Sequence, residues 1–193
     1  MPLSTPVDRE HIHTRTVECR GYRRADGLWD IEGHLVDTKT YGFDNQDRGR
    51  VEAGEPVHEM RLRLTIDDAF LIHEAEATTE YGPYRICGDI APNFALLKGL
   101  TIGPGWRRGI QAAVGGTKGC THLVEMLGPM ATAAFQTIWP FNAKRRQRPE
   151  GQRPAMMGTC HAYAEDSAIS RRLWPDYFDT GKTEAEPSAD QDA

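Results

Sequence analysis

Hydrophobic and polar positions alternate along much of the first half of the chain, and a period of two predicts β-strands. The stretch TRTVECRGYRR (14–24) is followed by Asp26-Gly27, a strong hairpin turn signal, and then by LWDIEGHLVDTKTY (28–41). In the second stretch the apolar or small residues that share one face are Trp29, Ile31, Gly33 and Leu35. The pattern therefore predicts an antiparallel hairpin.

Two further strands follow a charged stretch (42–56) that we expect to be a loop. VHEMRLRLTI (57–66) places four apolar side chains on one face, with His58 in phase with them. Asp67-Asp68 mark a turn, and FLIHEAEATT (70–79) supplies the next strand. About four antiparallel strands result, and one face of such a sheet must be covered.

The second half of the chain changes to helical spacing. DIAPNFALLKGL (89–100) predicts a helix that starts near Asp89, and GPGWRRGIQAAVGG (103–116) predicts a short one. THLVEMLGPMATAAFQTIW (121–139) predicts a long helix, which Pro129 should kink or locally break. The fold class is therefore α+β, with three or four helices on one face of the sheet.

The two ends of the chain lack the periodic apolar pattern of its centre. Residues 1–12 predict a flexible N-terminal tail, and the acidic stretch 180–193, interrupted by Pro187, predicts a disordered one. Between them, AMMGTCHAYAED (155–166) predicts a last strand or a short helix. The 193 residues therefore accommodate a single α+β domain over 13–179.

Composition narrows the classes of function. A net charge of -5 argues against a dedicated nucleic-acid-binding protein, and no apolar run is long enough to span a membrane. The N-terminus lacks the apolar stretch of a secretory signal, so we expect a cytoplasmic protein. In a reducing compartment the four cysteines are better read as buried thiols, ligands or nucleophiles than as disulfides.

The segment GTKGCTHLVEML places Cys120 and His122 at the start of the long helix. The partial positive charge of a helix N-terminus lowers the pKa of a thiol, which favours a thiolate ligand or nucleophile. Cys87 stands just before the helix predicted at Asp89, and Cys160 adjoins a histidine. The alternative is that these thiols are simply part of the core.

Thiolate and imidazole together suit zinc, or iron as in an iron–sulfur cluster, and they also suit a cysteine–histidine nucleophile pair. The metal-ligand candidates are His58, Cys87, Cys120 and Cys160. Cys120 and His122 are the catalytic candidates, and Asp89 is a candidate for orienting a histidine. Residue types alone leave metal and metal-free chemistry open.

With these residues in place, the chain resembles a bacterial family known as domain of unknown function 2889, over roughly residues 11–175. The resemblance rests on RGYRRADGLWDIEGHLVDTK, PVHEMRLRLTID, PYRICGDIAPNF, KGLTIGPGWR, GCTHLVEMLGPMATAAFQT and TCHAY. It implies a shared fold more than a function.

A second resemblance is to iron–sulfur scaffold proteins of the NifU/IscU type. RLRLTIDDAFLIHEAEA is similar to their hairpin, Lys98-Gly99 to the end of their next helix, and GCTHLVEML to the start of their last helix. The resemblance places Cys120 at the last ligand cysteine and His58 near the ligand aspartate, but the first ligand cysteine falls at about Pro56 and is missing. It implies a cleft where His58, Cys87 and Cys120 converge.

Two functions follow as hypotheses. The first is a catabolic enzyme that binds a small molecule in this cleft and uses zinc, iron or a thiolate–imidazole pair. The alternative is a metal or iron–sulfur carrier, or an accessory protein, without catalysis of its own. We expect neither nucleic acid nor membrane as a partner, and an exposed sheet edge would favour a homodimer.

Overall fold

A computed structural model describes residues 3–143 and 151–178 of the chain. The chain separates into two compact units, Met1–Lys144 and Arg145–Ala193, which we describe one at a time. The single domain predicted over 13–179 stays a prediction, and the predicted acidic tail lies outside the described residues.

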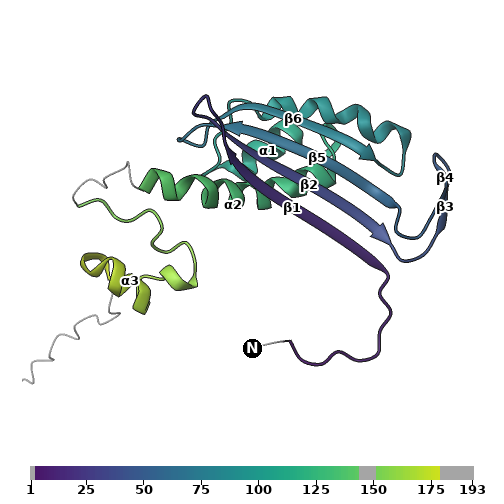
Figure 1. The fold of residues 1–193 in the computed structure, drawn as a ribbon. Coiled ribbons are helices and arrows are strands. Elements are labelled where there is room, and N and C mark those ends of the chain that lie inside the picture. Colours follow the sequence, from purple (N-terminus) through teal and green to yellow (C-terminus); the bar gives the residue numbers. More distant parts are fainter. Residues whose placement is uncertain (1–2, 144–150, 179–193) are drawn as a thin grey trace, which may run out of the picture. The chain divides into compact units, whose positions relative to one another are not determined.

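The first unit contains a four-stranded antiparallel sheet, as the alternation predicted (Figure 1). Its strands are β1 (His13–Arg23), β2 (Trp29–Lys39), β5 (Pro56–Ile66) and β6 (Ile72–Tyr81), in the order β1-β2-β5-β6. Gly27 adopts a φ of 89° in the first turn, a backbone conformation that glycine allows without strain. The first hairpin therefore forms where Asp26-Gly27 predicted it.

The loop predicted over 42–56 is wrong in part. It contains a small hairpin of β3 (Phe43–Asn45) and β4 (Gly49–Val51). The Asn45 side chain caps its turn by accepting the backbone N–H groups of Asp47 and Arg48 at 2.9 and 3.0 Å. Strands of three residues are too short for an alternating pattern to be visible in the sequence.

Four helical segments follow the sheet: η1 (Arg85–Leu97), α1 (Trp106–Val114), η2 (Gly116–Lys118) and α2 (Thr121–Ala143). The start predicted at Asp89 is wrong, because η1 is a 3-10 helix that begins four residues earlier. The backbone N–H of Arg85 donates to Asp47 Oδ2 at 2.9 Å, so the small hairpin supports this earlier start. Cys87 therefore lies inside the helical segment rather than before it.

Helix α2 continues through Pro129, so the predicted local break is absent, and the alternative of a kink stays a prediction. A proline ring also clashes with the Cβ of the residue before it, and here that residue is Gly128, which has no Cβ. The helix lies against one face of the sheet and covers β1, β2 and β5 (Figure 1).

The core fills the space between this sheet face and the helices. Gly21 and Gly33 let α2 approach closely, because a Cβ at Gly21 would overlap the Thr137 side chain. A Cβ at Gly33 would lie 2.7 Å from Met130 Sδ. The fully buried side chains include Ile31, Leu35, Leu64, Phe94, Leu123, Met126 and Leu127.

The second unit contains η3 (His161–Tyr163), α3 (Ala168–Leu173) and η4 (Pro175–Tyr177). Ser167 caps α3 by accepting the Ser170 backbone N–H at 3.0 Å. Of the two structures predicted for 155–166, the short helix is present as η3. Among the described residues of both units, no helix is long and apolar enough to cross a membrane.

Candidate functional site

Three charged or titratable residues lie side by side at one end of the helix-covered sheet face. The strand register places Arg15 of β1 opposite Asp37 of β2, and Asp37 opposite His58 of β5. Directly opposed residues project to the same face of a sheet. Asp37 continues the inward phase of Ile31 and Leu35, and only 2% of its surface is exposed.

The Asp37 carboxylate accepts four hydrogen bonds. Arg15 donates Nε to Oδ1 and Nη2 to Oδ2, each at 2.8 Å. His13 Nε2 lies 3.1 Å from Oδ1, and His58 Nδ1 lies 3.0 Å from Oδ2. Burial raises the pKa of Asp37, but its hydrogen bond to Arg15 and the nearby positive charge outweigh burial and lower it. The carboxylate is therefore ionised at neutral pH.

His122, in the first turn of α2, lies over His58. The ring centroids of the two imidazoles are 3.9 Å apart and the rings are inclined by 30°. Burial lowers the pKa of His58, as does the neighbouring His122, although Asp37 acts in the opposite direction. Burial also lowers the pKa of His122, and the Arg15 charge adds to this effect. Both rings are thus neutral at pH 7.

Asp37, His58 and His122 form a group that could hold a metal ion, since one ligand atom from each lies within 4.8 Å of the others. The three residues come from β2, β5 and α2. Neutral imidazole and ionised carboxylate are the forms that bind metals. The site therefore combines suitable ligand types with their ligating protonation states.

Arg15 connects this group to the helix that covers it. Its Nη1 donates to Glu125 Oε2 on α2 at 2.7 Å, while its other two nitrogens, Nε and Nη2, donate to Asp37. The Asp37 hydrogen bond raises the pKa of Arg15, which therefore stays charged. The guanidinium fixes the carboxylate and the helix start relative to each other.

Cys120 lies beside this group and is half-buried. Its carbonyl accepts the Val124 backbone N–H at 2.9 Å, which makes it the N-cap of α2. Its sulfur lies 3.7 Å from His122 Nδ1 and 3.8 Å from Met60 Sδ. The structure therefore brings together His58, His122 and, at the edge of the site, Cys120.

The other sequence candidates lie elsewhere. Cys87 packs in the first turn of η1, and a Cβ at Gly82 would lie 2.7 Å from Cys87 Cβ. Asp89 is exposed on the same helical segment. Cys160 is exposed and belongs to the second unit. The ligand roles of Cys87 and Cys160 and the orienting role of Asp89 stay predictions.

Sequence reasoning missed Asp37, Arg15, His13 and Glu125. Asp37 had a visible signal, because it extends the inward-facing series of β2 at two-residue intervals. The register of the first hairpin, counted back from Asp26-Gly27, then places Arg15 opposite it. Glu125 had no comparable signal, since its role depends on how α2 lies on the sheet.

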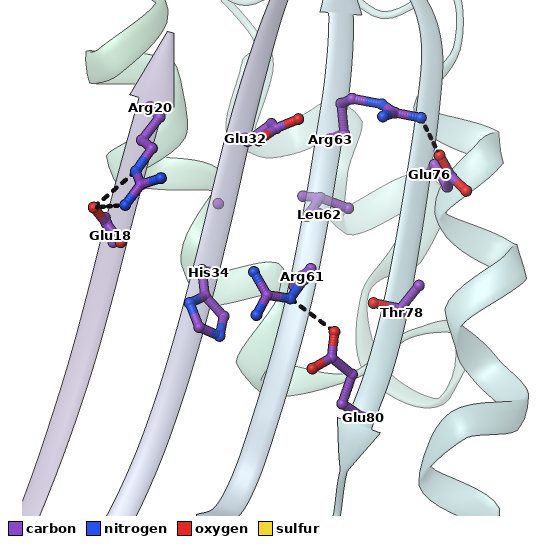
Figure 2. A pocket seen from close by; sticks show the side chains of 11 residues that line it. Glu18, Arg20, Glu32, His34, Arg61, Leu62, Arg63, Glu76, Thr78 and Glu80 are labelled. Atoms are coloured by element: carbon purple, nitrogen blue, oxygen red, sulfur yellow. Dashed lines mark hydrogen bonds and ion pairs between the residues drawn. The ribbon is translucent and has the colours of Figure 1, made fainter.

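The other sheet face carries a second group of polar side chains, around a hollow of about 540 Å³ (Figure 2). Here Arg20 pairs with Glu18 at 2.8 Å, Arg61 pairs with Glu80 at 2.7 Å, and Arg63 pairs with Glu76. Antiparallel sheets that are covered on one side commonly have such a polar outer face. The group of Asp37, His58 and His122 lies on the opposite face of the sheet.

Comparison with known proteins identifies the family. Residues 13–136 match the model of a family described as a protein of unknown function, DUF2889, and the chain belongs to this family. No curated protein and no solved structure matches the chain. The resemblance to iron–sulfur scaffold proteins therefore gains no support, and the family itself carries no assigned activity.

Proposed function

We propose that the protein is an enzyme that acts on a small molecule with a zinc or iron ion held by Asp37, His58 and His122. The observation that carries this proposal is the convergence of one ligand atom from each residue within 4.8 Å. Two histidines and one carboxylate occur as ligands in catalytic zinc sites and in non-haem iron sites, where they leave positions open for water and substrate.

The separation of the first two ligands supports an ion between them. His58 Nδ1 and Asp37 Oδ2 are 3.0 Å apart. Two ligand atoms bound to one ion at about 2.1 Å lie about 3.0 to 3.4 Å from each other, depending on the geometry. An ion bound between these two atoms would take the place of the Nδ1 proton, leaving His58 protonated on Nε2, and would require little movement of either side chain.

The surroundings of Asp37 support the same role. A carboxylate has about four acceptor positions, and Arg15, His13 and His58 occupy them. Arg15 and His13 could keep their hydrogen bonds to Asp37 if an ion took the place of the His58 proton. They would then be the outer partners that orient a ligating carboxylate, as in other metal sites.

The bound ion would polarise a substrate carbonyl or lower the pKa of a bound water to produce a nucleophile at neutral pH. His13 has an exposed side chain, and its Nε2 lies 3.1 Å from Asp37 Oδ1 at the solvent side of the site. The neutral state of His58 and His122 removes proton competition for the ion.

A second candidate is a metal-free general base, favoured by the Arg15–Asp37–His58 chain of hydrogen bonds. Because an ionised carboxylate only accepts, His58 Nδ1 carries the proton and Nε2 is left to accept one. The Cys120 sulfur, 3.7 Å from His122 Nδ1, would supply the nucleophile of a thiolate–imidazole pair. A metal carrier without turnover would share the ligands of the first proposal.

Metal analysis tests the choice. Protein purified from zinc- or iron-supplemented medium is expected to retain about one ion per chain, and His58→Ala and His122→Ala are expected to lose it. His73→Ala is the matched control, since His73 pairs with Asp67 at 2.8 Å outside the site. Absence of a stoichiometric ion in the wild type, or equal metal in all four proteins, would favour the metal-free base.

A further inference from the structure

Strand β1 forms a long open edge of the sheet. It pairs with β2 on one side, and no other strand of the described residues pairs with its far side. The opposite edge is protected where β6 begins. There the Ile72 backbone N–H donates to Leu100 O at 2.9 Å, and the Gly99 N–H donates to Ile72 O at 2.8 Å. An unprotected strand edge is a template for pairing with another strand.

The hydrogen bonds near the turn show which backbone groups of β1 are free. The Arg24 backbone N–H donates to Leu28 O at 2.9 Å, and the Thr40 N–H donates to Ile12 O at 3.2 Å. In an antiparallel pair, the residues that bond to the partner strand alternate with residues whose N–H and C=O point away. The even-numbered residues of β1 therefore bond to β2, and the odd-numbered residues from 13 to 23 offer their groups to a new strand.

We propose that a second copy of this chain pairs with β1, antiparallel, about a two-fold axis that passes through Cys19. In this register Glu18 of each copy lies opposite Arg20 of the other, which gives two pairs of opposite charge. Shifting the axis to Glu18 opposes two glutamates, and shifting it to Arg20 opposes two arginines. Opposed like charges destabilise a sheet, whereas opposed unlike charges stabilise it.

The side chains along the edge fit this partner. Val17 and Tyr22 are 38% and 43% exposed, so each has apolar surface that a second strand can cover. The register places Val17 opposite Gly21 of the second copy, and Tyr22 opposite Thr16 of the second copy. Both apolar side chains thus gain cover without a steric conflict between two large residues.

The register also opposes Arg15 to Arg23 of the second copy, and the charge of Arg15 is already compensated by two carboxylates of its own chain. Arg15 lies between the carboxylates of Asp37 and Glu125, while Arg23 lies 5.8 Å from the Trp29 ring centroid. The paired segment runs from 15 to 23, so His13 remains outside it. Dimer formation does not depend on the proposed ion, because no ligand of that ion lies on β1.

Light scattering coupled to size-exclusion chromatography tests the dimer. We expect the wild type to have twice the chain mass of 21.6 kDa. Glu18→Arg places four positive charges together and is expected to weaken association about tenfold or more. The double variant Glu18→Arg/Arg20→Glu exchanges the two charges within each copy and is expected to restore the dimer. A monomeric wild type at all soluble concentrations overturns the proposal.

Disulfide cross-linking tests the register. The variant Thr16→Cys/Tyr22→Cys is expected to form a covalent dimer under mild oxidation, because a non-hydrogen-bonded antiparallel pair has the Cα separation that a disulfide needs. All these variants carry Cys19→Ser, because the register places Cys19 opposite Cys19 of the second copy. Thr16→Cys and Tyr22→Cys alone in this background are the matched controls and are expected to stay uncrosslinked. A dimer that survives Glu18→Arg, or one that cross-links no more in the double variant than in the controls, uses a different surface.

Discussion

Asp37 and His58 lie opposite each other on neighbouring strands, and the Nδ1 atom of the histidine is 3.0 Å from the Oδ2 atom of the aspartate. A buried carboxylate at the end of a core-facing series requires a compensating partner, and Arg15 supplies it through two bonds of 2.8 Å. The same arrangement gives His58 a fixed orientation. The Asp37 carboxylate therefore has two roles: it pairs with Arg15 inside the protein, and it orients His58 for the proposed chemistry.

Replacing this carboxylate should expose its two roles. Asp37→Asn keeps the shape of the side chain but removes the buried charge that Arg15 pairs with and leaves it the more exposed Glu125, so we expect a loss of roughly 2 kcal/mol in the free energy of unfolding. The loss is smaller than for a fully buried pair because the Arg15 side chain is 35% exposed. The pKa of His58 should fall further, since Asp37 raises it.

Urea unfolding and NMR titration of the imidazole signals measure these two effects. Asp67→Asn, which removes the His73 partner elsewhere on the surface, is the control for the titration. An unchanged pKa of His58 in Asp37→Asn would show that the carboxylate does not act on that ring.

The pH dependence of metal-free stability follows from the same residues. His58 and His122 have pKa values below the ordinary 6.5, so their unfolded forms bind protons first. Their contribution to the free energy of unfolding is fully present above pH 6.5. It is lost as the pH falls from 6.5 toward the pKa values that the two rings have in the folded protein. Asp37, whose pKa lies below 3.8, contributes stability that is lost only in stronger acid.

Chemical denaturation between pH 8 and pH 5, in the presence of a chelator, checks this order. The wild type should become less stable across this window, whereas His58→Gln/His122→Gln should show a smaller slope. A stability curve that stays flat down to pH 5, or the same slope in both proteins, contradicts the neutral state of the two rings.

The turn before α2 positions Cys120 and His122, and Gly119 is its tightest point. A Cβ at residue 119 would overlap the carbonyl oxygen of Val114, which is backbone and cannot rotate away. Gly119→Ala should therefore cost about 1–3 kcal/mol and weaken metal binding by displacing His122. Gly88→Ala is the matched control, because nothing lies within 4 Å of its added Cβ. Thermal unfolding and metal titration should separate the two variants.

Cobalt substitution tests whether the Cys120 thiol is a metal ligand. Its sulfur lies near His122, but it is not one of the three atoms that lie mutually within 4.8 Å. We therefore expect cobalt-loaded protein to show no thiolate-to-metal charge-transfer band, and Cys120→Ala to bind cobalt as the wild type does. A strong band that disappears in Cys120→Ala would make the thiol a fourth ligand.

The four long strands could be predicted because each alternates over about ten residues and the first hairpin has a two-residue turn signal. The inward-facing position of Asp37 could also have been predicted, because it follows Leu35 by two residues on the core-facing side of β2. Its pairing with His58 was not readable, since residues 40–55 separate β2 from β5 and no turn fixes that register. The start of η1 was missed because it depends on Asp47, which is distant in the sequence.

The interpretation of the cysteines illustrates the remaining limit of sequence reasoning. The sequence predicts that Cys120 lies at a helix start but not which residues of the sheet its sulfur contacts. Those contacts depend on how α2 packs on the sheet over Gly21 and Gly33, and this packing also places the His122 ring over His58. The residues that gather around Asp37 are therefore fixed by tertiary packing.

Anomalous diffraction from crystals of the zinc- or iron-loaded protein, recorded on both sides of the metal absorption edge, would locate the ion. We expect one strong peak at about 2.0–2.2 Å from a carboxylate oxygen of Asp37 and from one ring nitrogen each of His58 and His122. A metal-loaded crystal with no peak among these three residues, or with its peak elsewhere, would contradict this expectation.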